Sequence, residues 1–325
     1  MSKSFVNKVL VGGALAAGAA VWAIAPRTFS DKRRNYVPAV PDVWYAHRGL
    51  HDAGSGLTAQ YASESGEYVA LARRMAMKAG YGSPSVVGAI APENSLAAFA
   101  AACEAGYGIE LDLQMTADGE IVVVHDGDLM RVAGDPRRVA DLTYDELTRI
   151  PLFPTDAPGA AVAAPLSGSL EKPPLVTTPD SAPDGYFQHV PLFADVLKVV
   201  AGRVPLIVEY KFDDNSKWGP RDVELMEKGD ALLQAYSGAY VIESFNPAAV
   251  NWYKENRPEV CRGQLSWWPQ GEEKPSDPGA LAKEYAAGAL IFDWISRPDF
   301  VAYDWHGGNS PQVRLARFMG AVPVS

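Results

Sequence analysis

The sequence predicts an α/β fold made of short buried strands that end in charged or polar side chains. Residues 108–126 read GIELDLQMTADGEIVVVHD, and Glu110 and Asp112 alternate with apolar residues, as in a strand with one apolar face. A second apolar run, 121–124, follows an Asp-Gly turn that leaves no room for a crossover helix, and His125 comes directly after it. Two acids and a histidine therefore converge without a long loop, which favours a functional site over a surface hairpin.

The segment before this strand has the pattern of a capped helix. Asn94 or Ser95 can accept a hydrogen bond at the start of an apolar stretch, residues 96–103, and Gly106 is a typical C-terminal stop. The chain then passes directly into the strand that carries Glu110. This order of helix and strand is the second observation that supports an α/β fold.

Two further strands end in polar residues. The run VWYAHRG at 43–49 brings His47 and Arg48 to one rim, and VPLIVEYK at 204–211 separates Glu209 from Lys211 by two positions, as in the first strand. Each residue alone has a structural explanation: a solitary histidine is commonly satisfied in a core, and a Glu-Lys pair can be a plain ion pair. Their joint occurrence at strand ends favours a site.

Composition sets limits on what this site can belong to. At 325 residues with 48% hydrophobic content, the chain can bury the core of one large domain or two ordinary ones. The net charge of −10 argues against nucleic acid as a partner, because no basic stripe can neutralise a phosphate backbone. Cys103 and Cys261, the only cysteines, are predicted to be free buried thiols.

The ordered motifs together resemble the glycerophosphodiester phosphodiesterase family. They are AHRG, PEN, IELD, a T-x-DG turn and VVVHD, followed by VPLIVEYK, VIESFNPAAV, PEVCRGQLS and PDFVAYD. The resemblance implies a (β/α)8 TIM-type barrel of the PLC-like phosphodiesterase kind over residues 37–325. It also implies two insertions, at 51–90 with a helix near 67–78 and at 153–187. Because the family pattern would continue past Ser325, we expect the barrel to lack its last strand or strands.

The resemblance also assigns roles to eight residues. It implies that His47 and His125 are the acid and base, that Glu110, Asp112 and Glu209 hold a divalent metal, that Arg48 and Lys211 bind the phosphate, and that Glu93 supports the site. The residue types agree, because three carboxylates in one cavity repel one another unless a cation is present. Oxygen ligands fit Ca²⁺ or Mg²⁺ better than zinc.

The activity implied by this family is metal-dependent hydrolysis of glycerophosphodiesters to glycerol 3-phosphate and an alcohol, and the partner is then a small molecule. Two alternatives stay open: a lysophospholipase D-type lipid phosphodiesterase acting on lysophospholipids, and a catalytically silent, membrane-tethered binding module. The sequence does not indicate the oligomeric state or the leaving alcohol.

The first 36 residues carry a targeting pattern. An uncharged run of 17 residues, 9–25, lies between basic residues and would span about 26 Å as a helix, close to the thickness of a hydrocarbon core. A cleaved signal peptide, and hence secretion, is one interpretation, but Pro26 is a poor cleavage context. We expect an uncleaved N-terminal membrane anchor, with the main domain on the cytoplasmic side.

Overall fold

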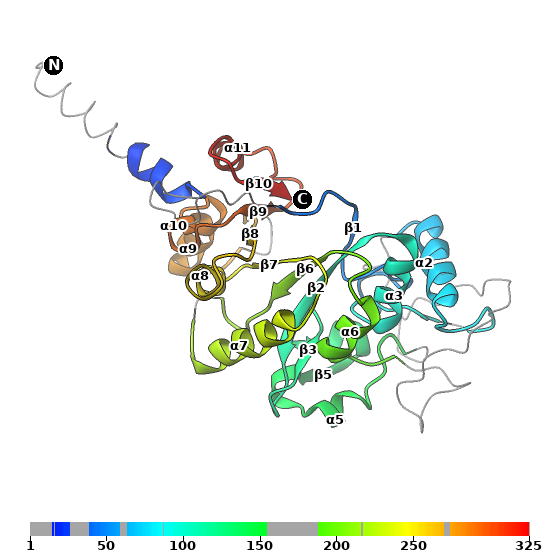
Figure 1. Cartoon of the computed structure of the whole chain (residues 1–325). Helices are drawn as coiled ribbons and strands as arrows, with labels where there is room; N and C mark the ends of the chain where they lie inside the picture. The colour runs from blue at the N-terminus through cyan, green and yellow to red at the C-terminus, as the bar shows by residue number, and fades with distance from the viewer. Residues whose placement is uncertain are drawn as a thin grey trace, which may run out of the picture. The chain divides into compact units, whose positions relative to one another are not determined.

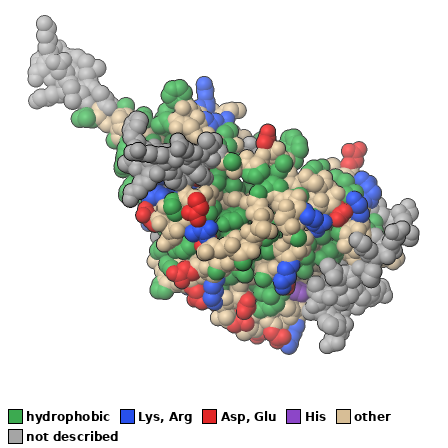
Figure 2. All heavy atoms as spheres, viewed as in Figure 1, with side chains coloured by type: hydrophobic (Ala, Val, Ile, Leu, Met, Phe, Trp, Pro, Cys, Tyr) green, Lys and Arg blue, Asp and Glu red, His purple; other side chains and the backbone are tan. Residues whose placement is uncertain are grey.

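The computed structural model of the chain describes residues 15, 17–26, 39–58, 64–86, 88–154, 188–215, 217–269 and 274–324. The chain forms two compact units, one of residues 41–240 and one that combines residues 1–40 with 241–325. Figure 1 labels most of the helices and strands of both. On the face drawn in Figure 2, basic and acidic side chains are interspersed, so this face presents no basic stripe.

Three parallel strands form the centre of the 41–240 unit. Strand β2 (Gly108–Met115) pairs with β1 (Tyr45–Ala46) on one side and β6 (Leu206–Tyr210) on the other. Strand β3 (Ile121–Val123) returns antiparallel to β2, which confirms the hairpin expected from the Asp-Gly turn. Gly119 in that turn has φ +83°, a conformation that favours glycine.

Helices and short elements complete this unit. They are α2 (Gly66–Lys78), α3 (Leu96–Ala105), β4 (Asp128–Leu129), α4 (Met130–Ala133), β5 (Asp135–Arg138), the 3-10 turn η2 (Val139–Asp141), α5 (Tyr144–Leu147), α6 (Phe193–Val200) and α7 (Pro220–Gln234). The helix expected within the first insertion is α2. Residues 155–187, nearly all of the second expected insertion, lie outside the described residues.

Helix α3 positions the turn that follows β1. The Ser95 hydroxyl accepts from the Ala98 N–H at 3.2 Å, and Gly106 ends the helix in the left-handed conformation, as the sequence predicts. A Cβ added to Gly49, at φ +83°, would lie 2.9 Å from the Ala98 Cβ. The close approach of this turn to α3 therefore depends on glycine.

The second unit repeats the alternation of strand and helix. Its strands run in the order β7 (Tyr240–Ser244), β8 (Arg262–Ser266), β9 (Phe300–Tyr303) and β10 (Val322–Val324), and neighbouring strands in this order are parallel. Between them come α8 (Pro247–Asn256), α9 (Pro278–Gly288), α10 (Asp293–Ser296) and α11 (Pro311–Phe318). The sequence analysis does not predict strand β10.

Both cysteines are free as predicted, although Cys103 is only half-buried.

The N-terminal segment corrects one prediction. Residues 17–24 are helical, and Ile24 packs into an apolar cluster of the same unit with Leu290 and Val301. The Arg297 guanidinium donates to the carbonyls of Trp22 and Ala25, both at 2.7 Å. Among the described residues, no helix has the length and apolar character needed to cross a membrane.

Over the described residues, the predicted membrane anchor and the membrane localisation based on it are therefore wrong. Residues 9–14 and 16 of the expected run lie outside the described residues. The physical reason is that hydropathy alone does not distinguish an anchor from a helix whose apolar side packs on its own domain. Here the last turn of the helix uses its apolar side chains and its free carbonyls for intramolecular contacts.

This packing predicts unequal effects of two alanine substitutions. Ile24→Ala removes a side chain that is 7% exposed and is expected to lower the free energy of unfolding by about 2–5 kcal/mol. Leu15→Ala, at a side chain that is 71% exposed, should change it by no more than about 0.5 kcal/mol. Urea unfolding of the full chain measures both values, and equal effects would contradict the described packing.

Candidate active site

The turn after β1 brings two polar residues to the rim of the sheet. Arg48 has φ +56°, a left-handed conformation that is uncommon for a non-glycine residue and is often found at functional sites. In this conformation its backbone N–H donates to Glu110 Oε2 at 2.9 Å. His47 Nε2 lies 3.8 Å from the same oxygen, and the His47 side chain is 67% exposed. The turn therefore places His47 at an accessible edge and Arg48 further inside.

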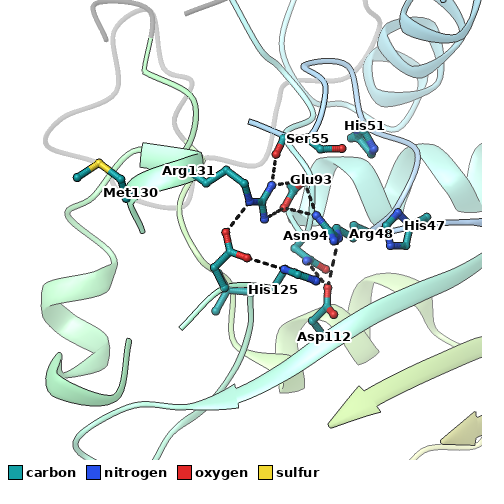
Figure 3. A network of polar contacts seen from close by, with 12 residues as sticks. His47, Arg48, His51, Ser55, Glu93, Asn94, Asp112, His125, Met130 and Arg131 are labelled. Carbon is teal, nitrogen blue, oxygen red and sulfur yellow. Dashed lines mark hydrogen bonds and ion pairs between the residues drawn. The ribbon is translucent and has the colours of Figure 1, made fainter. Parts of the chain in front are cut away.

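The turn before α3 supplies the partners of Arg48. Both oxygens of Glu93 accept from Arg48 Nη1 at 3.2 Å, and the Glu93 side chain is buried. The next residue, Asn94, donates through Nδ2 to Asp112 Oδ2 at 2.8 Å. Figure 3 shows these side chains directed toward one another from separate segments of the chain. Glu93 and Asn94 thus hold Arg48 and Asp112 in fixed orientations.

Buried carboxylates on β2 and β6 lie beside a lysine. The register sets Asp112 opposite Glu209, and a carboxylate oxygen of Glu110 lies within 4.8 Å of one of Glu209. Lys211 Nζ is 2.7 Å from Glu209 Oε2 and 3.2 Å from Asp112 Oδ1. Alternation along two adjacent strands therefore gathers three acids and one cation on one face of the sheet.

Burial and neighbouring charges shift the pKa values of Glu209, Lys211 and Asp112. Burial raises the pKa of Glu209, and the Asp112 carboxylate raises it further against the opposing effect of Lys211. Burial works to lower the pKa of Lys211, but the two neighbouring carboxylates outweigh it and raise the pKa. Burial also opposes ionisation of Asp112, yet Lys211 and the other nearby cations lower its pKa. A charged Lys211 beside an ionised Asp112 results.

The carboxylates fit a hard divalent cation. Glu209 Oε1 is buried and, among the described residues, accepts no hydrogen bond, so it is available as a ligand atom. Glu110 offers an oxygen within 4.8 Å of Glu209, a spacing that one ion can bridge. Asp112 contributes a third carboxylate, and its oxygens also contact Lys211, Asn94 and Arg48.

His125 follows β3 and faces a pocket. Its Nδ1 lies 2.6 Å from Asp126 Oδ1. The pocket has a volume of about 280 Å³. Its lining residues are Gln114, His125, Gly127, Asp128, Arg138, Lys211, Phe212 and Asp213. Because His125 and Lys211 line one cavity, a proton-transfer group and a cation can act on the same bound molecule.

His47 is more exposed than His125, and its pKa is shifted by its surroundings. Desolvation by the surrounding protein, followed by the adjacent Arg48 cation, lowers the pKa of His47 below its usual value. Solvent reaches 67% of the His47 side chain and screens part of the effect of the Arg48 charge. A neutral His47 near pH 7 can accept a proton.

Asp126 forms the other side of the His125 contact. Burial would raise the pKa of Asp126, but hydrogen bonds from His125 and Arg131 outweigh burial and lower the pKa. An ionised carboxylate has no proton to donate, so the proton of this hydrogen bond resides on His125 Nδ1. The opposite ring nitrogen, Nε2, is then left for chemistry.

All eight residues expected from the sequence lie in the 41–240 unit. Sequence reasoning missed three others that contact them: Asn94, considered only as a helix cap, and Asp126 and Arg131. The His-Asp dipeptide was a usable signal for Asp126, because an adjacent carboxylate commonly orients a histidine. For Arg131 the signal was weak, since its partners lie as far away as residue 55.

Comparison with known proteins gives short matches of high identity. A glycerophosphodiester phosphodiesterase from Caldanaerobacter subterraneus subsp. tengcongensis is 45% identical over 60 residues, which is 18% of this chain and 25% of that protein. Glycerophosphodiester phosphodiesterase 1 from Bos taurus is 43% identical over 61 residues, 18% of each chain. The match thus spans a quarter or less of the length of these curated relatives.

The fold is shared with a solved enzyme. An Oleispira antarctica phosphodiesterase, whose structure contains the product sn-glycerol-3-phosphate, superposes with a TM-score of 0.51 at 15% identity, over 86% of this chain and 82% of that one. This likeness confirms the predicted (β/α)8 TIM-type barrel fold. The model of the glycerophosphoryl diester phosphodiesterase family matches residues 87–300, more than half of the chain. The chain therefore belongs to the glycerophosphoryl diester phosphodiesterase family.

Proposed function

We propose that this chain hydrolyses glycerophosphodiesters to glycerol 3-phosphate and an alcohol. One observation carries the proposal: His125, fixed through Nδ1 by Asp126, lines the same pocket as Lys211, which contacts the carboxylates of β2 and β6. Membership of the family and the product in the Oleispira antarctica structure support the same reaction.

In the proposed reaction, the cationic side chains bind the phosphate and the histidines transfer protons. Arg48 and Lys211 bind the phosphoryl oxygens and stabilise the negative charge that increases on them in the transition state. One of the two histidines, His47 or His125, removes a proton from the attacking hydroxyl or water, and the other protonates the leaving oxygen. Glu93 keeps the Arg48 side chain oriented through its contacts with Nη1. Each group thus has a position that suits one step.

A divalent cation would be held by Glu110, Asp112 and Glu209, and Ca²⁺ and Mg²⁺ both suit such oxygen ligands. When bound, it would polarise the phosphoryl oxygens and lower the pKa of the attacking group. Binding would also offset the repulsion that raises the pKa of Glu209 beside Asp112.

The pocket favours small polar substrates over lysophospholipids. Apart from Gly127 and Phe212, its lining side chains are charged or carry polar groups, and about 280 Å³ is at the lower end of ligand-pocket volumes. An acyl chain would displace water from Asp128 and from the ion pair that Arg138 forms with Asp213 at 2.7 Å, and desolvation of these charges is unfavourable. A hydroxylated or ammonium-bearing alcohol can hydrogen-bond with these side chains instead.

A substrate panel tests this proposal. We expect kcat/KM for glycerophosphodiesters with small polar alcohols to exceed that for a lysophospholipid by roughly 10-fold or more, because an acyl chain would remove water from the charged side chains of the pocket. The assay measures glycerol 3-phosphate and released alcohol from each substrate. A preference for the lysophospholipid would contradict the assignment of the pocket, and binding without turnover would support a silent binding module.

A further inference from the structure

Arg131 lies at the centre of the polar network but outside the motifs of the sequence. It belongs to the four-residue helix α4, and its side chain is 14% exposed. Its Nε donates to Asp126 Oδ2 at 2.5 Å, and its two terminal nitrogens donate to Glu93 at 3.0 and 2.7 Å. Its Nη1 also donates to the Ser55 carbonyl. One guanidinium therefore joins three separate segments of the chain (Figure 3).

Through Asp126, Arg131 is connected to His125, the proposed acid or base of the reaction. Asp126 uses one oxygen for Arg131 and the other for His125 Nδ1, at 2.6 Å. Since Arg131 can only donate, it fixes which Asp126 oxygen remains for the histidine. The plane of the His125 ring is then set by a carboxylate that is itself held in place.

The contact with Glu93 extends to the phosphate-binding side. Glu93 is buried and accepts from Arg131 on one side and Arg48 on the other. The Leu57 backbone N–H additionally donates to the Arg131 carbonyl at 2.9 Å, so backbone and side chain of Arg131 both hold residues 55–57. These contacts need a planar fork with several donors, which a lysine does not have.

We infer that Arg131 is a positioning residue that sets the tautomer and orientation of His125 through Asp126 and the orientation of Arg48 through Glu93. The inference rests on the proposed function in taking His125 as an acid or base. Arg131 itself does not contact the reacting atoms in this role. It acts by keeping the His125 and Arg48 side chains in fixed orientations relative to each other.

Asparagine at position 126 gives a specific test, because its amide has only one acceptor oxygen. In Asp126→Asn, Arg131 takes that oxygen, and the amide NH₂ must then face His125 Nδ1. Nδ1 becomes an acceptor, so the ring proton moves to Nε2. Adding Arg131→Met removes the competing donor, so the amide oxygen is free to rotate toward His125 and accept from Nδ1–H again.

The measurement is ¹⁵N NMR of labelled histidine in the full chain, with the His125 signals assigned by their loss in His125→Ala. We expect Nδ1–H in the wild type, Nε2–H in Asp126→Asn, and Nδ1–H again in the double variant. An Asp126→Asn protein that retains Nδ1–H would overturn the inference. The same tautomer in the single and double variants would also overturn it, because a purely structural arginine would not control the amide.

Turnover gives a second measurement on a single conservative variant. Arg131→Lys is expected to lower kcat by about 10²-fold, since a displacement of about 1 Å in catalytic groups has an effect of that size. Arg149→Lys is the matched control, because Arg149 forms a surface ion pair with Asp145 in which both side chains are more than 70% exposed. A kcat for Arg131→Lys within about threefold of the control would contradict the positioning role.

The two proposals can fail separately. If the wild type releases no product from any glycerophosphodiester, the proposed function fails, while the NMR tautomers still decide whether Arg131 governs His125. Conversely, an active enzyme in which Arg131→Lys keeps its turnover and Asp126→Asn keeps Nδ1–H retains the proposed function and loses the inference. The Asp126 side chain is 29% exposed, so Asp126→Asn leaves the packed core intact.

Discussion

Replacing His125 with alanine is expected to lower kcat by about 10²- to 10⁴-fold, because general acid-base groups act in the transition state. His47→Ala should have an effect in the same range, since the reaction needs one group to accept a proton and one to donate it. Neither substitution should disturb the fold, as the His47 side chain is 67% exposed and the His125 side chain 29%. Steady-state turnover of a glycerophosphodiester, with circular dichroism of each variant, measures both effects.

A matched control is present in the second unit. His306 Nδ1 lies 3.1 Å from Asp304 Oδ1, which resembles the His-Asp contact of the candidate site, but the His306 side chain is 59% exposed and belongs to another unit. His306→Ala should leave kcat unchanged. Near-normal turnover in His47→Ala or His125→Ala would remove that histidine from the mechanism.

Removal of divalent metal is expected to abolish hydrolysis, and added Ca²⁺ or Mg²⁺ should restore it. The reason is that Glu110 and Glu209 bring carboxylate oxygens within 4.8 Å of each other in a buried place, where an ion offsets their repulsion. Glu209→Gln deletes one anionic ligand and should weaken binding of the ion by about 10-fold or more. Calorimetric titration of the chelated protein with Ca²⁺ measures binding independently of activity.

The control for this variant is Glu224→Gln. Glu224 forms a surface ion pair with Lys228 at 2.8 Å, and its side chain is 48% exposed, so its loss should alter neither ion affinity nor turnover. Full activity in excess chelator would contradict a metal-dependent mechanism. Equal ion affinity in Glu209→Gln and the wild type would remove Glu209 from the ligand set.

The sequence predicted those parts of the site that depend on strand periodicity. Glu110 and Asp112 share a face of β2 because side chains alternate along a strand, and Glu209 on β6 and Lys211 directly after it repeat that spacing. The alignment of Asp112 with Glu209 is a matter of register between strands that are about a hundred residues apart in sequence. Periodicity contains no information on that register, and the family resemblance implied only that both residues belong to one site.

The contacts that sequence reasoning missed are those made across irregular segments. Arg131 reaches Glu93 and the Ser55 carbonyl from a helix of one turn, so no helical or strand period relates it to its partners. Asn94 was a candidate cap because Asn and Ser both cap helices, but Ser95 caps α3 and Asn94 bonds to Asp112. Such assignments depend on tertiary contacts.

The error at the N-terminus has a similar origin. A short apolar helix with basic flanks satisfies the pattern of an anchor, and only its partners decide its environment. Those partners, Arg297 and the cluster around Leu290, lie more than 260 residues further along the chain. The sequence alone does not show that the carbonyls of Trp22 and Ala25 are hydrogen-bonded to Arg297.

The most direct test of the proposed function is ³¹P NMR of a glycerophosphodiester incubated with the full chain and Ca²⁺ or Mg²⁺. We predict that the diester signal is replaced by that of glycerol 3-phosphate, in step with the release of free alcohol, and that the His125→Ala protein does this at least about 10²-fold more slowly. An unchanged diester signal with either ion, or a phosphorylated alcohol with free glycerol as the products, would contradict the proposed function.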